Sequence, residues 1–432
     1  MKTFSLIAKI ILASVFMLCF ASCGSGNGSG GDGNTGKIEV ATSGALDANF
    51  GTGGIVRTGL GSFFSQSTTL VIQVDGKIVV MGGSMGAYTL ARYHSDGSLD
   101  HGFGNGGVAT MLPAVNGGYP NGLALQPDGK IIVVGSSYNG TDNDINVVRF
   151  LADGSVDAAW GNRGQLISSV GTDEVAYGVA VQPDGKVLVV GFAPNGIDND
   201  FLLVRFNSDG SLDATFGLNG IVKTSFRPRF AVMLGASANH VAILADGKIV
   251  VAGSVLVAQQ FSSQVDGALV RYLNNGTVDA TFGLNGYVTN IGGGFGLSGF
   301  LMQRDGKICV STYDGGYSGS IYRYSTNGSL DMQFGQGGTI SSNSSPYLAL
   351  DSQGRIVAAG QVFNGTSNII EVTRYLQDGG LDSSFGAGGK VLTYLSSYDY
   401  PTTVIIQDDG KILVAGSTND PGGSVVILRY EP

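Results

Sequence analysis

The chain has 432 residues, a net charge of −9 and 13% charged residues, with no cluster of basic residues. This charge balance excludes nucleic acid as a ligand, because nothing can displace the counterions of its phosphate groups. The 43% hydrophobic content is enough for a buried core. The 71 glycines are a marked excess over the usual share of about 7%, which indicates many turns, a linker, or both.

The first 22 residues have the features of an export signal. Lys2 and Lys9 precede an apolar run over residues 10–20, and small residues follow it. A basic start and an apolar stretch too short to span a bilayer are typical of a secretory signal peptide.

The stretch LCFASCGSG resembles the bacterial lipoprotein signal, in which a cysteine after two small residues is lipidated and becomes the mature N-terminus. Phe20 stands where leucine is usual in that signal. The resemblance implies that residues 1–22 are removed and that Cys23 holds the protein at the bacterial outer membrane or cell surface. The alternative is an ordinary signal peptide with an incidental cysteine.

Residues 23–43 are predicted to form a flexible tether behind the lipid. The sequence from Gly24 to Gly36, GSGNGSGGDGNTG, has no apolar residue to pack. A chain of this composition and length spans roughly 20 Å. We expect the tether to hold the folded domain, residues 44–432, just off a membrane surface.

Two motifs alternate along the rest of the chain. One reads VRFNSDGSLDATFGLNGIV at residues 204–222, and the other reads QPDGKIIVVG at residues 126–135. Variants of both return in step. Each unit is about 50–60 residues long, which is the size of a propeller blade rather than of a helical repeat.

The Asp-Gly pairs of these motifs fit either calcium loops or hairpin turns. The acidic position becomes asparagine at Asn275 and Asn327. No copy has the glutamate that a helix-loop-helix calcium loop requires. Asp-Gly and Asn-Gly between apolar runs are strong hairpin signals, because these residues tolerate positive φ. The motifs therefore predict hairpins.

Each unit predicts four short strands. Examples are GLALQPDG, KIIVVG, INVVRF and GIVKT. The second strand is almost wholly apolar and β-branched, which suits a strand that is covered on both faces. Radially packed four-stranded sheets provide that environment. The predicted fold class is therefore all-β, a propeller of four-stranded blades.

The repeat count is seven, and it indicates how the ring closes. An arginine followed by an aromatic residue ends the third strand seven times, at Arg92, Arg149, Arg205, Arg271, Arg323, Arg374 and Arg429. The LDxxFG element also occurs seven times, but it begins early, at Leu46 and Asp47, and is missing after Arg429. We therefore expect the N-terminal strand to complete the C-terminal blade, which leaves no open sheet edge.

Both motifs resemble the delta-60 repeat family, a bacterial repeat that forms propellers. The resemblance covers residues from about 45 to 430, and only the copy at Gln353-Gly354-Arg355 departs from the DGK form. It implies a seven-bladed β-propeller lipoprotein, and it implies no particular biochemical activity.

Every repeated arginine except Arg429 is followed eight residues later by the aspartate of LDxxFG, as in Arg205 and Asp213. In a hairpin centred on the DG turn these two positions face each other. We interpret them as repeated, partly buried ion pairs. The alternative, a ring of arginines that binds an anion, is disfavoured because the third strand of a blade lies away from the central channel.

Candidates for metal or catalytic chemistry are few, and no cofactor is expected. The loops NGTDND and NGIDND bring Asp142, Asp144, Asp198 and Asp200 to one rim, so calcium is an alternative to two solvated loops. The chain has only three histidines, too few for a histidine-rich metal site. His240 begins a predicted inner strand, where it is either structural or directed toward the channel mouth.

The binding face is expected on the rim opposite the DGK and DGS turns, because those turns are short and nearly identical around the ring. Connections on the opposite rim are long or aromatic, at 224–239, 253–266, 394–401 and 117–120. Variable loops on a rigid scaffold usually carry the binding residues. The candidates are Arg227, Arg229, Phe230, Tyr398 and Tyr400. The alternative is that these loops only cover the channel mouth.

These features predict a cell-envelope propeller that is not an enzyme and that contacts the membrane only through its lipid. The expected partner on the variable-loop face is a protein or a glycan. The alternative is a hydrolase or lyase that acts on glycans or lactones through rim or channel carboxylates, with or without calcium. We favour binding, because no blade clearly carries acid–base residues that the others lack.

A Cys23→Ala variant tests the predicted anchor. Two or more acyl chains give stable membrane attachment where a single chain does not, so the variant should move from the membrane fraction to the soluble fraction. Fractionation of cells that express either form measures this. Continued sedimentation of the variant with membranes would rule out lipidation at Cys23.

Overall fold

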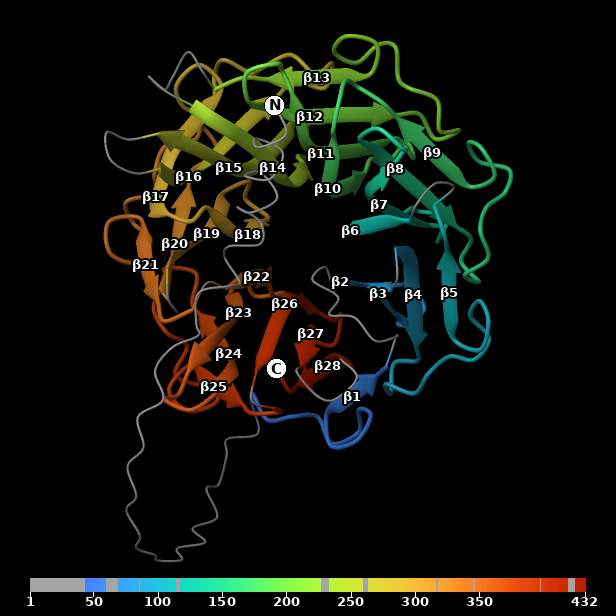
Figure 1. Cartoon of the computed structure of the whole chain (residues 1–432). Coiled ribbons are helices and arrows are strands. Elements are labelled where there is room, and N and C mark those ends of the chain that lie inside the picture. The colour runs from blue at the N-terminus through green and yellow to red at the C-terminus, as the bar shows by residue number, and fades with distance from the viewer. Residues whose placement is uncertain are drawn as a thin grey trace, which may run out of the picture. The chain divides into compact units, whose positions relative to one another are not determined.

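The computed structural model describes residues 43–59, 69–84, 86–113, 117–226, 233–258, 263–315, 318–344, 346–396, 398–418 and 424–432. These residues form seven four-stranded antiparallel sheets, arranged as the blades of a propeller (Figure 1). No helix long and apolar enough to cross a membrane occurs in these ranges. The predicted all-β, seven-bladed fold class is confirmed.

Within each blade the strands run from the axis outward in chain order, except that the seventh blade ends with the N-terminal strand. Blades 1 to 3 comprise β2 (Thr69–Ile72), β3 (Ile78–Ser84), β4 (Ala87–Tyr93) and β5 (Val108–Met111); β6 (Gly118–Leu125), β7 (Ile131–Tyr138), β8 (Asn143–Phe150) and β9 (Gln165–Ser168); and β10 (Val175–Val181), β11 (Val187–Pro194), β12 (Asn199–Phe206) and β13 (Ile221–Thr224). Blades 4 and 5 comprise β14 (Met233–Ile243), β15 (Ile249–Ala258), β16 (Ser263–Tyr272) and β17 (Tyr287–Gly294); and β18 (Leu297–Met302), β19 (Ile308–Gly315), β20 (Ser318–Tyr324) and β21 (Thr339–Ser342). Blades 6 and 7 comprise β22 (Tyr347–Leu350), β23 (Ile356–Phe363), β24 (Asn368–Tyr375) and β25 (Lys390–Thr393); and β26 (Asp399–Ile406), β27 (Ile412–Thr418), β28 (Ser424–Tyr430) and β1 (Ile55–Thr58).

The hydrophobic core lies between neighbouring blades. Ile132 and Val134 of β7 are fully buried in one cluster with Val187 and Val189 of β11, the second strand of the next blade. Both faces of a second strand are covered in this way, because a blade has a neighbour on each side. This explains why the second strands are apolar at consecutive positions and do not alternate with polar residues.

The ring closes as predicted. Strand β1 pairs antiparallel with β28, with Ile55 opposite Leu428 and Thr58 opposite Val425. A further bridge joins Leu46 to Tyr430. The first described residues of the chain therefore complete the sheet that contains its last strand (Figure 1).

A buried arginine at the end of each third strand connects three parts of the structure. Arg205 donates from Nε to Asp213 Oδ2 at 2.8 Å, and its guanidinium lies 4.2 Å from the centre of the Phe216 ring. It also donates to the backbone oxygen of Asn274 in the next blade, at 2.6 Å. The guanidinium therefore joins its own hairpin, the LDxxFG loop and the neighbouring blade.

The ion pair and the contact with the aromatic ring recur at all seven repeated arginines. Each one is paired with the aspartate of an LDxxFG element and lies over the aromatic ring of that element, and at the closure Arg429 pairs with Asp47 at 2.7 Å and lies over Phe50. The predicted ion pairs are confirmed.

The aspartate of the closing pair is strongly held in its ionised form. Burial disfavours the charge of Asp47, but hydrogen bonds from Lys411, from the backbone of Asn49 and from Arg429 outweigh it and lower its pKa to about 2. Lys411 belongs to the DGK turn of blade 7, so both repeated motifs meet at this carboxylate. We call the face that carries the DGK and DGS turns the motif-turn rim.

All four expected connections are partly strand: residues 118–120 belong to β6, residues 233–239 to β14 and residues 399–401 to β26. The largest difference is at residues 253–266. Residues 253–266 were predicted to form a long connection, but β15 and β16 run through most of this stretch as an extended hairpin, with Val257 opposite Gln264. Alternating apolar residues such as Val255 and Val257 continue the ladder past the length that the other blades have. Cys309 of β19 is fully buried.

Deleting residues 46–58 tests the closure. The deletion removes β1 and Asp47 and leaves Arg429 as a buried charge without its partner, which typically costs about 3–5 kcal/mol. We expect a large fall in melting temperature, measured by circular dichroism. Deleting residues 24–36 of the tether is the matched control and should leave the melting temperature unchanged. Equal melting of both variants would show that the closure is dispensable.

Candidate functional site

The innermost strands of the blades surround the axis of the propeller (Figure 1). In five blades this strand contains a β-bulge, and the residue at which the register of the ladder shifts is polar and half-buried. These residues are Asn121, Tyr177, Asn239, Ser298 and Thr402. Bulges redirect side chains and are over-represented next to active sites. An inner strand has no strand neighbour on its axial side, so these polar groups border the axis.

The position after the bulge is tightly constrained between blades. At Gly178 a Cβ atom would lie 2.5 Å from the backbone oxygen of Asn239, and at Gly122 it would lie 2.8 Å from that of Tyr177. Three blades meet this constraint with glycine, which has no Cβ. We call this set of equivalent positions the axial ring; its members are Thr69, Gly122, Gly178, His240, Gly299, Tyr347 and Thr403.

His240 is the histidine of the axial ring. It pairs with Ala252 in the ladder, and its imidazole stacks on Phe300 of the next blade, with 5.9 Å between ring centres and 17° between planes. The side chain is half-buried, and no described residue forms a hydrogen bond with it. Burial lowers the pKa of His240 to about 4. At neutral pH the imidazole is therefore uncharged and has a nitrogen free to accept a proton or a hydrogen bond.

Tyr347 occupies the same ring position in blade 6. Its aromatic ring packs against the hydrophobic cluster between blades 6 and 7. Burial raises the pKa of Tyr347, so the phenol stays protonated at neutral pH. No hydrogen bond from its hydroxyl to another described residue is present. Between His240 and Tyr347, blade 5 has Gly299, which adds no side chain to the ring.

The axial ring therefore combines a neutral base with a protonated acid. Neither group has a hydrogen-bond partner within the described ranges, although buried polar groups usually have one. The sequence predicted His240 on an inner strand but gave it no catalytic role, and Tyr347 was missed. Aligning the repeats on the DGK turn shows the signal: HVAILADGK and YLALDSQGR have His and Tyr where GVAVQPDGK and GLALQPDGK have glycine.

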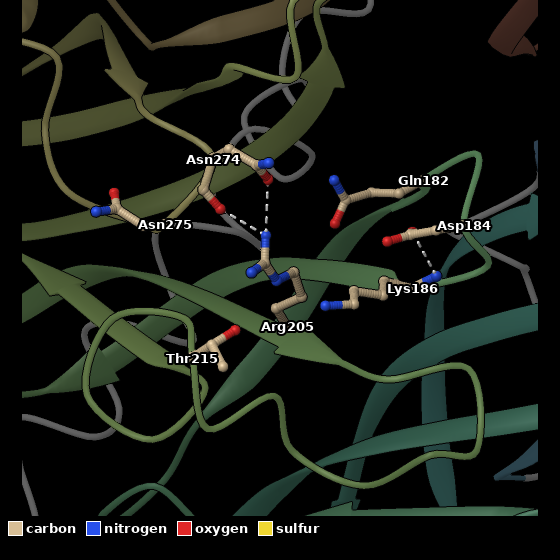
Figure 2. A pocket seen from close by; sticks show the side chains of 7 residues that line it. All are labelled: Gln182, Asp184, Lys186, Arg205, Thr215, Asn274 and Asn275. Atoms are coloured by element: carbon tan, nitrogen blue, oxygen red, sulfur yellow. Dashed lines mark hydrogen bonds between the residues drawn. The ribbon is translucent and has the colours of Figure 1, made fainter.

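A hollow on the motif-turn rim lies between blades 3 and 4 (Figure 2). It has a volume of about 430 Å³. Its lining is polar and consists of Gln182, Asp184, Lys186, Arg205, Thr215, Asn274 and Asn275. Lys186 donates to Asp213 at 2.8 Å, so both cations of the lining, Lys186 and Arg205, pair with one carboxylate.

Two of the five predicted binding residues lie in the described part of the structure. Arg227, Arg229 and Phe230 lie outside the described residues. Tyr398 is 41% exposed and immediately precedes β26, whereas Tyr400 lies within β26 and is half-buried. Binding at this rim stays a prediction.

The four acidic candidates accept hydrogen bonds from an asparagine within their own loops. The Asn195 amide donates to Asp198 at 2.5 Å and to Asp200 at 2.7 Å. Asn139 does the same for Asp142 and Asp144. The described part of the chain contains no group of three or more His, Cys, Asp or Glu side chains that could hold a metal ion. The visible role of these aspartates is thus to fix the loops that begin the third strands.

Comparison with protein families gives one match, to a family described as a domain of unknown function (DUF5122) beta-propeller. Seven stretches match, at 73–103, 126–159, 182–216, 244–282, 303–334, 352–385 and 407–432. They coincide with the seven repeats found in the sequence. No curated protein matches the chain.

Solved structures with a similar fold include enzymes. The PQQ-bound aldose sugar dehydrogenase from Streptomyces coelicolor has 14% identity and a TM-score of 0.43, and the alignment covers 75% of this chain and 96% of that one. Polysaccharide lyase Uly1 has 10% identity and a TM-score of 0.47 over 85% and 90% of the two chains. Drosophila Semaphorin 2a has 8% identity and a TM-score of 0.49 over 87% and 75%.

These likenesses establish the propeller fold alone. They nevertheless correct the expectation that the chain is not an enzyme, because two of these three propellers are enzymes. That expectation also relied on the absence of a blade with distinctive acid–base residues. The axial ring removes this second reason, since blades 4 and 6 carry His240 and Tyr347 where three other blades carry glycine.

Proposed function

Since the chain belongs to the DUF5122 beta-propeller family, whose description names no activity, we propose a function from the geometry: an enzyme that acts on a glycan or a sugar lactone at its axis. The observation that carries the proposal is the pair of unpartnered groups in the axial ring, His240 and Tyr347. A neutral imidazole removes a proton, and a protonated phenol supplies one.

The polar side chains at the bulges suit a substrate with many hydroxyl groups. Amides and hydroxyls of Asn121, Asn239, Ser298 and Thr402 both donate and accept hydrogen bonds. Asn121 also ties adjacent blades together by donating to the backbone oxygen of Ala176 at 2.8 Å. The bulges are thus held in place before any ligand arrives, as a pre-organised site requires.

The chemistry follows from the two groups. In a lactone, His240 takes a proton from the attacking water while Tyr347 protonates the oxygen that leaves the carbonyl carbon. In a glycan that contains uronic acid, His240 takes the proton from the carbon next to the carboxyl group, and Tyr347 protonates the departing glycosidic oxygen. Both reactions need one base and one acid on either side of a sugar ring.

The cellular address belongs to the same proposal. Residues 1–22 act as the export signal, and lipid on Cys23 holds the propeller at the bacterial envelope through the tether. The support is the sequence alone, because these residues lie outside the described ranges. An envelope glycan, or a lactone derived from one, is the substrate class that a propeller at this address meets.

Substitution of the two ring residues tests the proposal. The wild type should turn over at least one member of a panel of sugar lactones and uronic-acid oligosaccharides. His240→Ala and Tyr347→Phe should each lower kcat/KM by about 100-fold or more, because positioned acid–base groups contribute at least that much. The acidic limb of the wild-type pH profile should lie near pH 4, because His240 must lose its proton to act and its pKa is about 4.

Thr403→Ala is the matched control for these substitutions, because it changes the same ring position in blade 7. It should keep most of the activity, and all three variants should melt near the wild-type temperature. The absence of turnover on the whole panel would contradict the proposal. Full activity of the His240 and Tyr347 variants would contradict it equally.

A further inference from the structure

We propose that the hollow between blades 3 and 4 on the motif-turn rim is a second ligand site, which binds one neutral sugar unit. It is separate from the axial site. Its walls come from the DGK turn of blade 3, from the third strand of that blade and from the DGS-type turn of blade 4, and none of its lining residues belongs to an innermost strand (Figure 2).

The first argument is an unused acceptor. The Gln182 side chain is 6% exposed, and its Oε1 atom has no hydrogen-bond partner within the described structure. In blades 1 and 2 the equivalent glutamines accept from the repeated arginine: Arg92 donates to Gln73 at 3.3 Å, and Arg149 donates to Gln126 at 3.5 Å. In blade 3 that bond is missing, as it is at Gln303 and Gln407 of blades 5 and 7. Gln182 lines the hollow, so a ligand hydroxyl can replace the bond there.

In blade 3 the guanidinium of Arg205 bonds Asn274 and not Gln182. Arg205 Nη1 donates to the backbone oxygen of Asn274 at 2.6 Å and to its side-chain Oδ1 at 3.1 Å. The residues at the equivalent turn position in the other complete blades are Ser95, Ala152, Ser208, Thr326 and Gln377. Figure 2 shows Gln182 and Asn274 extending toward each other from opposite walls.

The charge of the lining favours a neutral ligand. Arg205 and Lys186 already share Asp213. The exposed carboxylate of Asp184 would repel an anion. Hydrogen-bonding groups remain on several sides, among them Gln182 Oε1, the amides of Asn274 and Asn275, and the ammonium group of Lys186, which has donors left beyond its bond to Asp213.

The lining also favours a sugar over a peptide. Its members are amides, charged groups and one threonine, and it has no aromatic or aliphatic anchor. Docked peptides are held mainly by such apolar anchors in pockets. A sugar unit instead presents hydroxyl groups on every side, each of which donates and accepts. The volume of about 430 Å³ falls within the usual range for small-ligand sites.

Gln182→Leu tests the site without threatening the fold, because Leu244 already occupies this motif position in blade 4. Asn274→Ser is the second variant, because Ser208 stands at the equivalent position of the preceding blade. It removes the side-chain acceptor that Arg205 uses in blade 4. Gln303→Leu makes the same change in blade 5 and is the matched control.

The measurement is saturation-transfer NMR of the detergent-solubilised full-length protein with D-glucose, D-galactose and N-acetylglucosamine. At least one sugar should bind, and Gln182→Leu and Asn274→Ser should each weaken its binding by about tenfold, the effect of one lost hydrogen bond to a buried acceptor. Gln303→Leu and His240→Ala should bind as the wild type does.

The proposal fails if none of the three sugars binds, if Gln182→Leu binds as tightly as the wild type, or if Gln303→Leu weakens binding equally. Loss of binding in His240→Ala would place the sugar at the axial site instead. Preferential binding of an acetylated dipeptide amide would make the hollow a peptide site and would also overturn the proposal. If the protein turns over no member of the panel of lactones and oligosaccharides but still binds a sugar at this hollow, the proposed catalytic function fails and the proposal for this hollow stands.

Discussion

The buried arginine–aspartate pair of each blade is the interaction on which the rest of the structure depends. The aspartate has two cationic partners in most blades, the repeated arginine and the residue that follows the DG or QG turn, as in Asp47 with Arg429 and Lys411. The arginine reaches the next blade through a backbone carbonyl. A buried charge is tolerated only when it is paired and hydrogen-bonded. Here one carboxylate binds cations from both repeated motifs, and its arginine partner also bonds the neighbouring blade.

Because of this arrangement, residue types vary between blades to different extents on the two faces and at the axis. The motif-turn rim carries the ion pairs, so its turns are nearly invariant, and variation there occurs at single positions such as Asn274. The innermost strands contribute nothing to the ion pairs and are constrained mainly by close backbone approach. Glycine satisfies that constraint, and a larger residue such as His240 requires its neighbour to accommodate it by stacking, as Phe300 does.

Most of the fold follows from short-range sequence signals. Asp-Gly turns between apolar runs define the hairpins, and the missing partner of Arg429 predicts its pairing with Asp47 across 382 positions of sequence. The extended hairpin of blade 4 was misread as a loop because Gln259, Gln260, Ser262 and Ser263 interrupt its apolar pattern. Periodicity alone does not distinguish a polar strand end from a connection.

The candidate sites were harder to predict, for physical reasons. His240 and Tyr347 matter because of the glycines that they replace, and the role of those glycines depends on carbonyl groups of the neighbouring blade. Gln182 has the same motif position as the other glutamines, and its unpaired acceptor is shared with Gln303 and Gln407. The hollow that it lines together with Asn274 distinguishes it. Such differences arise from contacts between blades, which a single repeat does not reveal.

The most direct test of this account is a double-mutant cycle on the closing pair. Unfolding by urea would be measured for Asp47→Asn, Arg429→Met and the double variant. Asp47→Asn leaves Arg429 buried without its counter-charge, and Arg429→Met leaves Asp47 with Lys411 as its cationic partner. If the pair closes the ring, the double variant should be more stable than the sum of the single effects by about 2–3 kcal/mol. Additive effects, within about 0.5 kcal/mol, would contradict the claim that this ion pair holds the propeller closed.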